Sequence, residues 1–269
     1  MSKSRKLSPL PGTADAGLWT ANNEFGTVNY AEAVFPLLRR KGPKEAEIVG
    51  TGFYVLPNGC FLTARHVLED PETLFAIQLM ADRTYHVRTI QDAFHHPTGD
   101  ISVGVFSPLV HRVTGASLMN VTVPLAPTQP GATTPIATYS YPLHEVRSEQ
   151  AGVSVNLQPD FYHGHLGEYY AERGPSGRLA CPYYMADLHL YGASSGGPVV
   201  SSSGPVFAIA SASYDGANDL AFLTPVSLAG DITIPKVDMK DGHGAKTRPF
   251  RDILNTHFKK AVPPYKSSL

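Results

Sequence analysis

The chain has 269 residues, of which 22 are Lys or Arg and 23 are Asp or Glu, so its formal net charge is −1. This balance, with only short basic clusters, argues against a nucleic-acid partner. No apolar run reaches the roughly 18 residues of a membrane helix. No apolar stretch follows the basic N-terminus as it does in a secretory signal. We therefore expect a cytoplasmic protein that binds neither nucleic acid nor membrane.

The cysteine content points the same way. Cys60 and Cys181 are the two cysteines of the chain, and neither has the spacing of a metal ligand. A reducing compartment keeps such residues as thiols. We expect two free thiols, no metal site and no cofactor.

The first half of the chain predicts a barrel. Residues 1–25 are rich in Ser, Pro, Gly and Lys and are predicted to be a mobile arm. Residues 26–122 carry short runs of β-branched and aromatic residues between turn signals such as Pro57-Asn58-Gly59. This pattern predicts an N-terminal β-barrel with strands at 33–38, 48–56, 60–64, 74–80, 84–90 and 101–106.

The second half repeats this organisation. The stretch 118–134 contains Pro124, Pro127 and Pro130 and is predicted to link two units. Residues 132–232 are predicted to form a C-terminal β-barrel, with glycine-containing hairpins and loops at 158–182. Residues 233–269 should hold a helix at 247–260, which has apolar residues along one face, and a tail. The strands of the second barrel are expected at 136–141, 152–157, 183–190, 198–201, 206–213 and 220–224.

Three residues carry the chemistry that the sequence predicts. Ser195 lies in the glycine-rich stretch YGASSGGP at 191–198, which permits a tight turn that projects a hydroxyl. His66 follows a predicted strand in LTARHV at 62–67, where a general base could be fixed. Asp100 precedes an alternating apolar strand and could be partly buried, so it could orient an imidazole.

Each of these signals has a plain structural alternative. A Ser-Gly-Gly-Pro loop is more often an ordinary loop, the chain has eleven histidines, and an aspartate often precedes a strand. His95 and His96 are rival bases, although neither directly follows a strand as His66 does. Together, however, the three residues occur in the order His, Asp, Ser, with the first two in one unit and the serine in the other. This order differs from that of α/β-hydrolases and subtilisins and predicts a site between two barrels.

Six motifs resemble those of the trypsin-like serine peptidases, and in particular the HtrA/Deg branch of bacterial enzymes. The resemblance implies an all-β, chymotrypsin-like fold of two antiparallel six-stranded β-barrels, and it covers roughly residues 33–230. The motifs are GTGF at 50–53, LTARHV at 62–67, GDISV at 99–103, DLHLYGASSGGP at 187–198, GPVFAI at 204–209 and FLTPV at 222–226.

The resemblance also implies the role of each site residue. Ser195 is expected to be the nucleophile, His66 the general base and Asp100 the residue that orients it. The backbone N–H groups of Ala193 and Ser195 would form the oxyanion hole. The resemblance implies a substrate-binding pocket formed by His189, Ala210, Ser211 and Ala212.

Three departures from the family pattern accompany the resemblance. Ala193 stands where these peptidases usually have glycine, and Ser194 stands where trypsin zymogens have an activating aspartate. The segment after the last expected strand is too short for the PDZ domain of HtrA proteins. A further departure concerns specificity, because His189 stands at the position that carries an acidic group in trypsin.

The leading interpretation is a serine endopeptidase that cleaves a protein or peptide substrate, with a regulatory protein as a further partner. A catalytically silent protease-fold module that binds a peptide or protein is the alternative, and Ala193 is its main support. A lipase or esterase is a third possibility, but the order of the three residues and the absence of alternating helices disfavour it.

Overall fold

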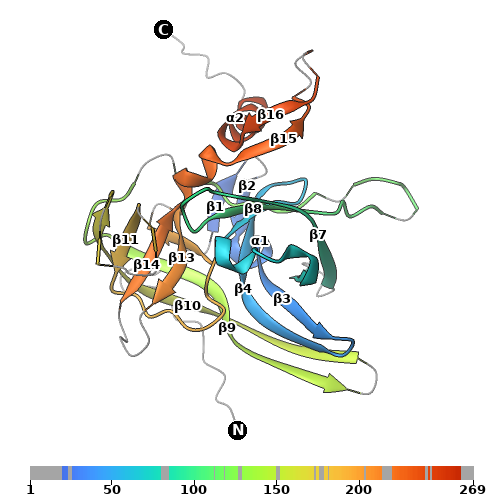
Figure 1. Ribbon diagram of the computed structural model, residues 1–269, viewed down its shortest axis with the longest axis horizontal. Helices are drawn as coiled ribbons and strands as arrows, with labels where there is room; N and C mark the ends of the chain where they lie inside the picture. Colours follow the sequence, from blue (N-terminus) through green and yellow to red (C-terminus); the bar gives the residue numbers. More distant parts are fainter. Residues whose placement is uncertain are drawn as a thin grey trace.

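The computed structural model describes residues 20–23, 26–79, 85–111, 113–117, 119–126, 129–149, 152–172, 174–175, 179–180, 182–202, 204–213, 220–239, 242 and 244–261. Two closed, six-stranded antiparallel barrels account for most of this chain, as the sequence predicted (Figure 1). Residues 1–19 of the predicted arm lie outside the described residues, and its last part pairs as strands β1 (Thr20–Asn23) and β2 (Gly26–Asn29). A short helix, α1 (Tyr30–Ala33), leads into the first barrel.

The first barrel closes in the order β3-β4-β5-β8-β7-β6. Alternating apolar residues direct large rings into its interior, where Phe61 stacks on Phe106 with ring centroids 4.4 Å apart. Burial of each such ring stabilises the fold by roughly 1.5–3 kcal/mol. Its strands are β3 (Val34–Gly42), β4 (Glu45–Leu56), β5 (Cys60–Thr63), β6 (Leu74–Leu79), β7 (Tyr85–His95) and β8 (Ser102–Phe106).

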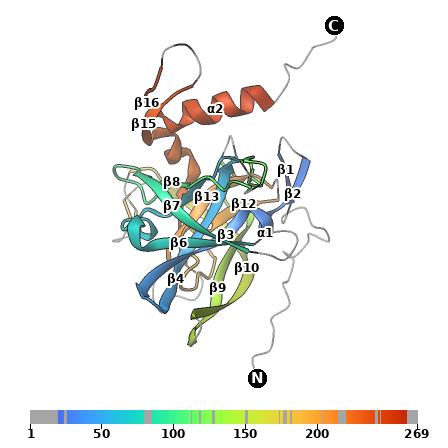
Figure 2. The same cartoon turned by 90° about the vertical axis from the view of Figure 1, so that its right-hand side faces the viewer.

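The second barrel closes in the order β10-β11-β14-β13-β12-β9. Strands β9 and β10 continue past the barrel as a long hairpin. This hairpin lies beside the β3–β4 hairpin in both views (Figures 1 and 2). The strands are β9 (Pro135–Glu149), β10 (Gly152–Tyr170), β11 (Tyr183–Ala186), β12 (Pro198–Ser201), β13 (Val206–Ser213) and β14 (Ala221–Pro225).

The second barrel differs from the prediction at three strands: β9 is longer, β11 is shorter, and β10 differs most. The sequence predicted hairpins and loops from residue 158 onward, but the strand continues to Tyr170 with a bulge between Gln158 and Asp160. Gly164 is required there by packing, because a Cβ at this position would lie 2.0 Å from the backbone oxygen of Asp187. The prediction was wrong because a glycine that permits close strand contact has the same sequence signature as a turn.

An apolar core continues from one barrel into the other. Buried residues of β3–β8 form one cluster with Tyr139, Tyr141 and Val200 of the second barrel. The Tyr141 hydroxyl also donates to the backbone oxygen of Val34 at 3.0 Å. The two barrels are therefore packed against each other through residues that water does not reach, which fixes the cleft between them.

The segment between β8 and β9 is attached to both barrels in turn. The backbone N–H of Asn120 donates to the oxygen of Pro57 in the first barrel, whereas the N–H of Ala126 donates to the oxygen of Val206 in the second. Asn120 also takes part in a buried polar group around Arg88, which is only 3% exposed. The Arg88 guanidinium donates to side-chain oxygens of Tyr54, Gln78 and Asn120, none of which is a carboxylate.

The chain ends in a small unit above the barrels (Figure 2). Strands β15 (Thr233–Val237) and β16 (Lys246–Pro249) form a hairpin that the sequence did not predict, and helix α2 (Phe250–Ala261) follows it. The helix begins three residues later than predicted because 247–249 belong to β16. Phe250 is 1% exposed and anchors this unit in the apolar core.

The sequence also predicted that both cysteines are free thiols and that no helix spans a membrane. The Cys60 thiol is free and buried, and burial raises its pKa to about 12; Cys181 lies outside the described residues. Among the described helices, none is both long and apolar enough to cross a membrane. The described side chains contain no cluster of three or more His, Cys, Asp or Glu residues that could hold a metal ion.

Candidate active site

His66 lies in a single 3-10 turn, Arg65–Val67, directly after strand β5. This turn carries the imidazole from the end of a barrel strand toward the cleft, and about half of the side chain is exposed. Val67, the last residue of the turn, is buried and packs into the apolar core, which anchors the turn. The sequence prediction of a histidine just past a strand end is therefore confirmed, with the imidazole available to a ligand.

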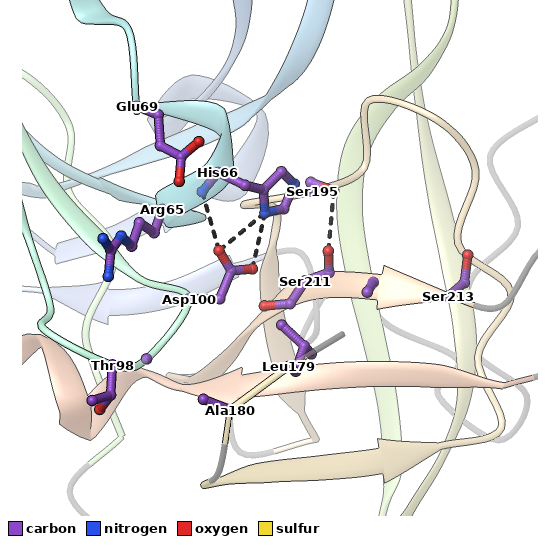
Figure 3. Close-up of a pocket in the computed structure, with 12 residues that line it drawn as sticks. Arg65, His66, Glu69, Thr98, Asp100, Leu179, Ala180, Ser195, Ser211 and Ser213 are labelled. Carbon is purple, nitrogen blue, oxygen red and sulfur yellow. Dashed lines mark hydrogen bonds and ion pairs between the residues drawn. The ribbon is translucent and has the colours of Figure 1, made fainter. Parts of the chain in front are cut away.

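Asp100 holds His66 at two points. The carboxylate oxygens lie 3.0 Å from Nδ1 of His66, and Oδ1 also accepts the backbone N–H of His66 at 3.1 Å. Asp100 is mostly buried, with 11% of its side chain exposed. Because Nδ1 faces the carboxylate, it carries the ring proton and leaves Nε2 as the acceptor in the neutral imidazole. Figure 3 shows this pair among the residues that line the cavity.

The charge environment raises the pKa of His66. Burial alone lowers this pKa, but the hydrogen bond and negative charge of Asp100, with a smaller contribution from Glu69, outweigh burial. The net effect stabilises the imidazolium, which is the form that a general base reaches after it accepts a proton.

His96 holds the loop that carries Asp100. From the sequence, His96 is considered only as an alternative to His66 as the general base. His96 is 7% exposed, and its Nδ1 accepts the backbone N–H of Gly99 at 2.7 Å. Arg65 adds a second tie, because its Nη1 donates to the backbone oxygens of His96 and Pro97, each at 3.0 Å. The turn with His66 and the loop with Asp100 are thus connected beside the carboxylate. Sequence spacing could not reveal this connection, since it depends on loop conformation.

His95, the other rival base, is also engaged elsewhere. Its Nδ1 lies 2.6 Å from the hydroxyl of Ser102 at the start of strand β8. Burial and the charge of Arg65 lower the pKa of both His95 and His96. Neither imidazole lines the cavity that contains His66.

Ser195 lies in a loop of two consecutive tight turns. Ser194 N–H donates to the oxygen of Tyr191, and Gly197 N–H donates to the oxygen of Ser194. The third residues of these turns, Ala193 and Gly196, have φ of 66° and 86°. A positive φ at this position is the signature of a type II turn. Glycine adopts it freely, but for Ala193 it costs roughly 1–2 kcal/mol.

The backbone donors of this loop fall into two groups. The N–H groups of Ser194, Gly196 and Gly197 each have a backbone acceptor. The N–H groups of Ala193 and Ser195 donate to no group that the structure describes, although the loop around them is ordered by hydrogen bonds. These two donors lie on either side of Ser194 and next to the Ser195 hydroxyl. They are therefore suited to receive an oxyanion.

The loop is pressed against the first barrel. Thr51 of strand β4 donates its backbone N–H to the oxygen of Ser195 at 2.8 Å and its hydroxyl to the oxygen of Ala193 at 2.9 Å. A Cβ at Gly196 would lie 2.2 Å from the oxygen of Thr51, so only glycine permits this approach. Thr51 lies in the GTGF motif, but no sequence pattern indicated that its hydroxyl reaches the serine loop.

The Ser195 hydroxyl points to a neighbouring carbonyl. It donates to the backbone oxygen of Ser211 at 3.3 Å, and no hydrogen bond joins it to His66 in the described structure (Figure 3). His66, Asp100 and Ser195 nevertheless line one cavity of about 550 Å³. The structure therefore brings the three predicted residues together, with one of the two expected hydrogen bonds formed.

Of the four predicted substrate-binding residues, two line the cavity and two do not. Ser211 and Ala212 line this cavity together with Ser213. Ala210 is fully buried in the core of the second barrel, which is at odds with a direct contact between its side chain and substrate. His189 does not line the cavity. Its ring packs edge-on against that of Tyr191, with the ring centroids 4.2 Å apart. Asp187 is paired with His165 and also lies outside the lining. Leu179 and Ala180 line the cavity and were not predicted.

Comparison with solved structures supports the fold. Deg5 is 17% identical, with a TM-score of 0.51 over 73% of this chain and 85% of that chain. The protease domain of MamO from Magnetospirillum magneticum is 14% identical, with a TM-score of 0.51 over 74% and 94% of the two chains. An inactive serine-to-alanine form of Rv3671c from M. tuberculosis H37Rv is 14% identical, with a TM-score of 0.50 over 74% and 83%. At these identities the likeness concerns the fold alone.

Comparison of sequences identifies the family. A search of curated proteins gave no significant match. The family model described as a trypsin-like peptidase domain matches residues 50–209, which is more than half of the chain and includes His66, Asp100 and Ser195. The chain therefore belongs to the trypsin-like peptidase family.

Proposed function

We propose that the protein is an active serine endopeptidase in which Ser195 is the nucleophile, His66 the general base and Asp100 the residue that orients it. The observation that carries this proposal is the two-point hold of Asp100 on His66 at the wall of a cavity that also contains Ser195. An aspartate that fixes the tautomer and stabilises the imidazolium is what a histidine base requires. Membership of a peptidase family adds support.

The reaction begins with rotation of the Ser195 side chain. Its hydroxyl leaves the carbonyl of Ser211 and turns toward Nε2 of His66 as the substrate enters. Nε2 accepts the hydroxyl proton while Oγ attacks the peptide carbonyl, and the N–H groups of Ala193 and Ser195 receive the resulting oxyanion. The imidazolium then gives its proton to the leaving amine. Water repeats these steps on the acyl-enzyme and releases the acid.

The substrate is a protein or peptide that lies against Ser211 and Ala212. No acidic side chain is available at the position of His189, and Asp187 is held by His165 instead. We expect cleavage after uncharged residues, because the second barrel lines the cavity with uncharged side chains, those of Leu179, Ala180, Ser211, Ala212 and Ser213.

The test is labelling with a fluorophosphonate probe, followed by assay on a peptide library. Wild-type protein should be labelled at Ser195, and Ser195→Ala should abolish both labelling and cleavage without loss of fold. Ser202→Ala is the matched control, because Ser202 is exposed in a turn and does not line the cavity. If wild-type protein is neither labelled nor active, the catalytically silent binding module replaces this proposal.

A further inference from the structure

The nucleophile loop combines a backbone cost with an anchor from the other barrel. Ala193 has a φ of 66°, in the left-handed region that disfavours every residue with a Cβ. Rotation about its N–Cα bond would relieve this strain. If the residues after Ala193 were free, the rotation would carry Ser195 and its N–H with it. The loop therefore needs a restraint on its downstream side.

Thr51 supplies a restraint at that place. Its hydroxyl holds the carbonyl of Ala193 at 2.9 Å, and its N–H holds the carbonyl of Ser195 at 2.8 Å. Ala193 and Ser195 are the residues directly before and after Ser194. Thr51 is completely buried, whereas Ala193 and Ser195 are partly exposed, so the two donors come from the protein interior and hold the loop at the edge of the cleft.

The anchor is itself fixed within the first barrel. The oxygen of Thr51 accepts the hydroxyl of Thr63 at 2.8 Å, which connects strand β4 to strand β5, the strand that leads to His66. Ser194 is held from the opposite side, where its hydroxyl accepts that of Ser140 of strand β9 at 3.1 Å. The loop is therefore held between the two barrels. Ala193 packs against an apolar cluster of the first barrel, but among the described residues only Thr51 joins the loop to that barrel by hydrogen bonds.

We infer that Thr51 is a positioning residue for the oxyanion hole, which holds the Ala193–Ser195 segment in its donor-presenting conformation against the strain at Ala193. This inference rests on the proposed function. Thr51 does not touch the substrate and acts through the loop. The side-chain hydroxyl is the component that mutation can remove, because the backbone N–H remains in every variant.

The experiment is a double-mutant cycle of Thr51→Val with Ala193→Gly. Valine keeps the β-branched shape and lacks the hydroxyl, so Thr51→Val should lower kcat by about 10-fold, within the ~10²–10³-fold effect of losing one hole donor. KM should stay nearly constant, because the hole acts on the transition state. Thr51→Ser, which keeps a hydroxyl, should retain kcat to within about 3-fold.

The glycine background supplies the decisive comparison. In Ala193→Gly the strain is absent, so removal of the Thr51 hydroxyl should lower kcat by no more than about 3-fold. Thr138→Val is the control for a buried Thr-to-Val change, since the Thr138 hydroxyl is buried and has no hydrogen-bond partner among the described residues. Thr138→Val should leave kcat unchanged.

Two outcomes would overturn the inference. One is an active wild-type enzyme in which Thr51→Val has the kcat of wild type. The other is an equal loss from Thr51→Val in the alanine and glycine backgrounds, which would indicate a structural role independent of the strain. Melting temperatures of all variants separate that structural role from positioning. An inactive, unlabelled wild-type protein would contradict the proposed function, from which this inference follows.

Discussion

The Asp100 carboxylate contacts both the ring and the backbone of His66, at 3.0 Å from Nδ1 and 3.1 Å from the backbone nitrogen. A single carboxylate thus fixes the position of the turn and the orientation of the ring. If the ring rotates about its side-chain bonds, it loses the hydrogen bond at Nδ1, whereas the backbone N–H of His66 keeps its own. The carboxylate–imidazole pair is formed in this structure, whereas the Ser195 hydroxyl donates to the backbone oxygen of Ser211.

Replacement of Asp100 by asparagine tests this relationship. The asparagine side chain would offer an amide N–H to Nδ1, so the imidazole would present an N–H to Ser195 through Nε2 and could not accept its proton. We expect Asp100→Asn to lower kcat by about 10³–10⁴-fold with little change in KM. Single-turnover kinetics on a cleaved peptide would measure it. A loss below about 10-fold would contradict the role assigned to Asp100.

The pH dependence of kcat/KM should report His66. The base must be neutral, so activity falls as the pH drops through the pKa of His66, which is raised. Glu69 contributes to this increase through its negative charge. Glu69→Gln should lower the pKa and move the acid limb of the profile to lower pH.

Glu72→Gln is the control for this shift, because Glu72 is exposed and does not line the cavity. Its profile should superimpose on that of wild type. A Glu69→Gln profile that moves to higher pH would have the wrong sign and would exclude the charge effect.

His96 should support the Asp100 loop through Nδ1 as an acceptor. The side-chain oxygen of asparagine can occupy nearly the same position, whereas that of glutamine lies one bond further out. His96→Asn should therefore remain close to wild type in stability, and His96→Gln should lose about 1–3 kcal/mol, because a buried N–H loses its acceptor. Denaturant unfolding measures both, and equal losses would show that the hydrogen bond to Gly99 contributes little.

Substrate preference provides a separate test of the binding region. For matched peptides that differ only in the residue before the cleaved bond, kcat/KM should be higher for uncharged residues than for Arg or Lys. Relative rates from competing peptides give the ratio directly. A preference of about 10-fold or more for Arg or Lys would contradict this expectation and would indicate that an acidic side chain of the cavity, such as Glu69, contacts the substrate.

The sequence was sufficient to predict the two barrels and the proximity of His66, Asp100 and Ser195 because these signals are local. The catalytic roles of the three residues stay a prediction. Strands β3 to β8 follow short alternating runs bounded by turns, and His66 and Asp100 lie at strand ends. The order of the three residues then placed them on opposite sides of one cleft. These inferences need only the pattern of side chains along the chain.

The remaining features depend on contacts between distant segments. Strand β10 was misjudged because Gly164 permits contact with Asp187, which no local pattern shows. Hairpin β15–β16 has few apolar residues, so its signal is weak. The hydroxyl of Thr51 and the imidazole of His96 serve backbone groups, and the conformation of a loop decides which backbone groups they meet.

Arg88 has a consequence for how the first barrel assembles. A guanidinium stays charged at every pH that the protein tolerates, so it can be buried only where enough oxygen atoms surround it. One of these oxygens belongs to Asn120, which follows the last strand of the barrel and lies in the segment that leads to the second. The barrel is therefore not complete at its sixth strand. We expect the connecting segment to wrap around the barrel in the same cooperative step that buries this charge, so an excised N-terminal half should need the residues through Asn120 to fold.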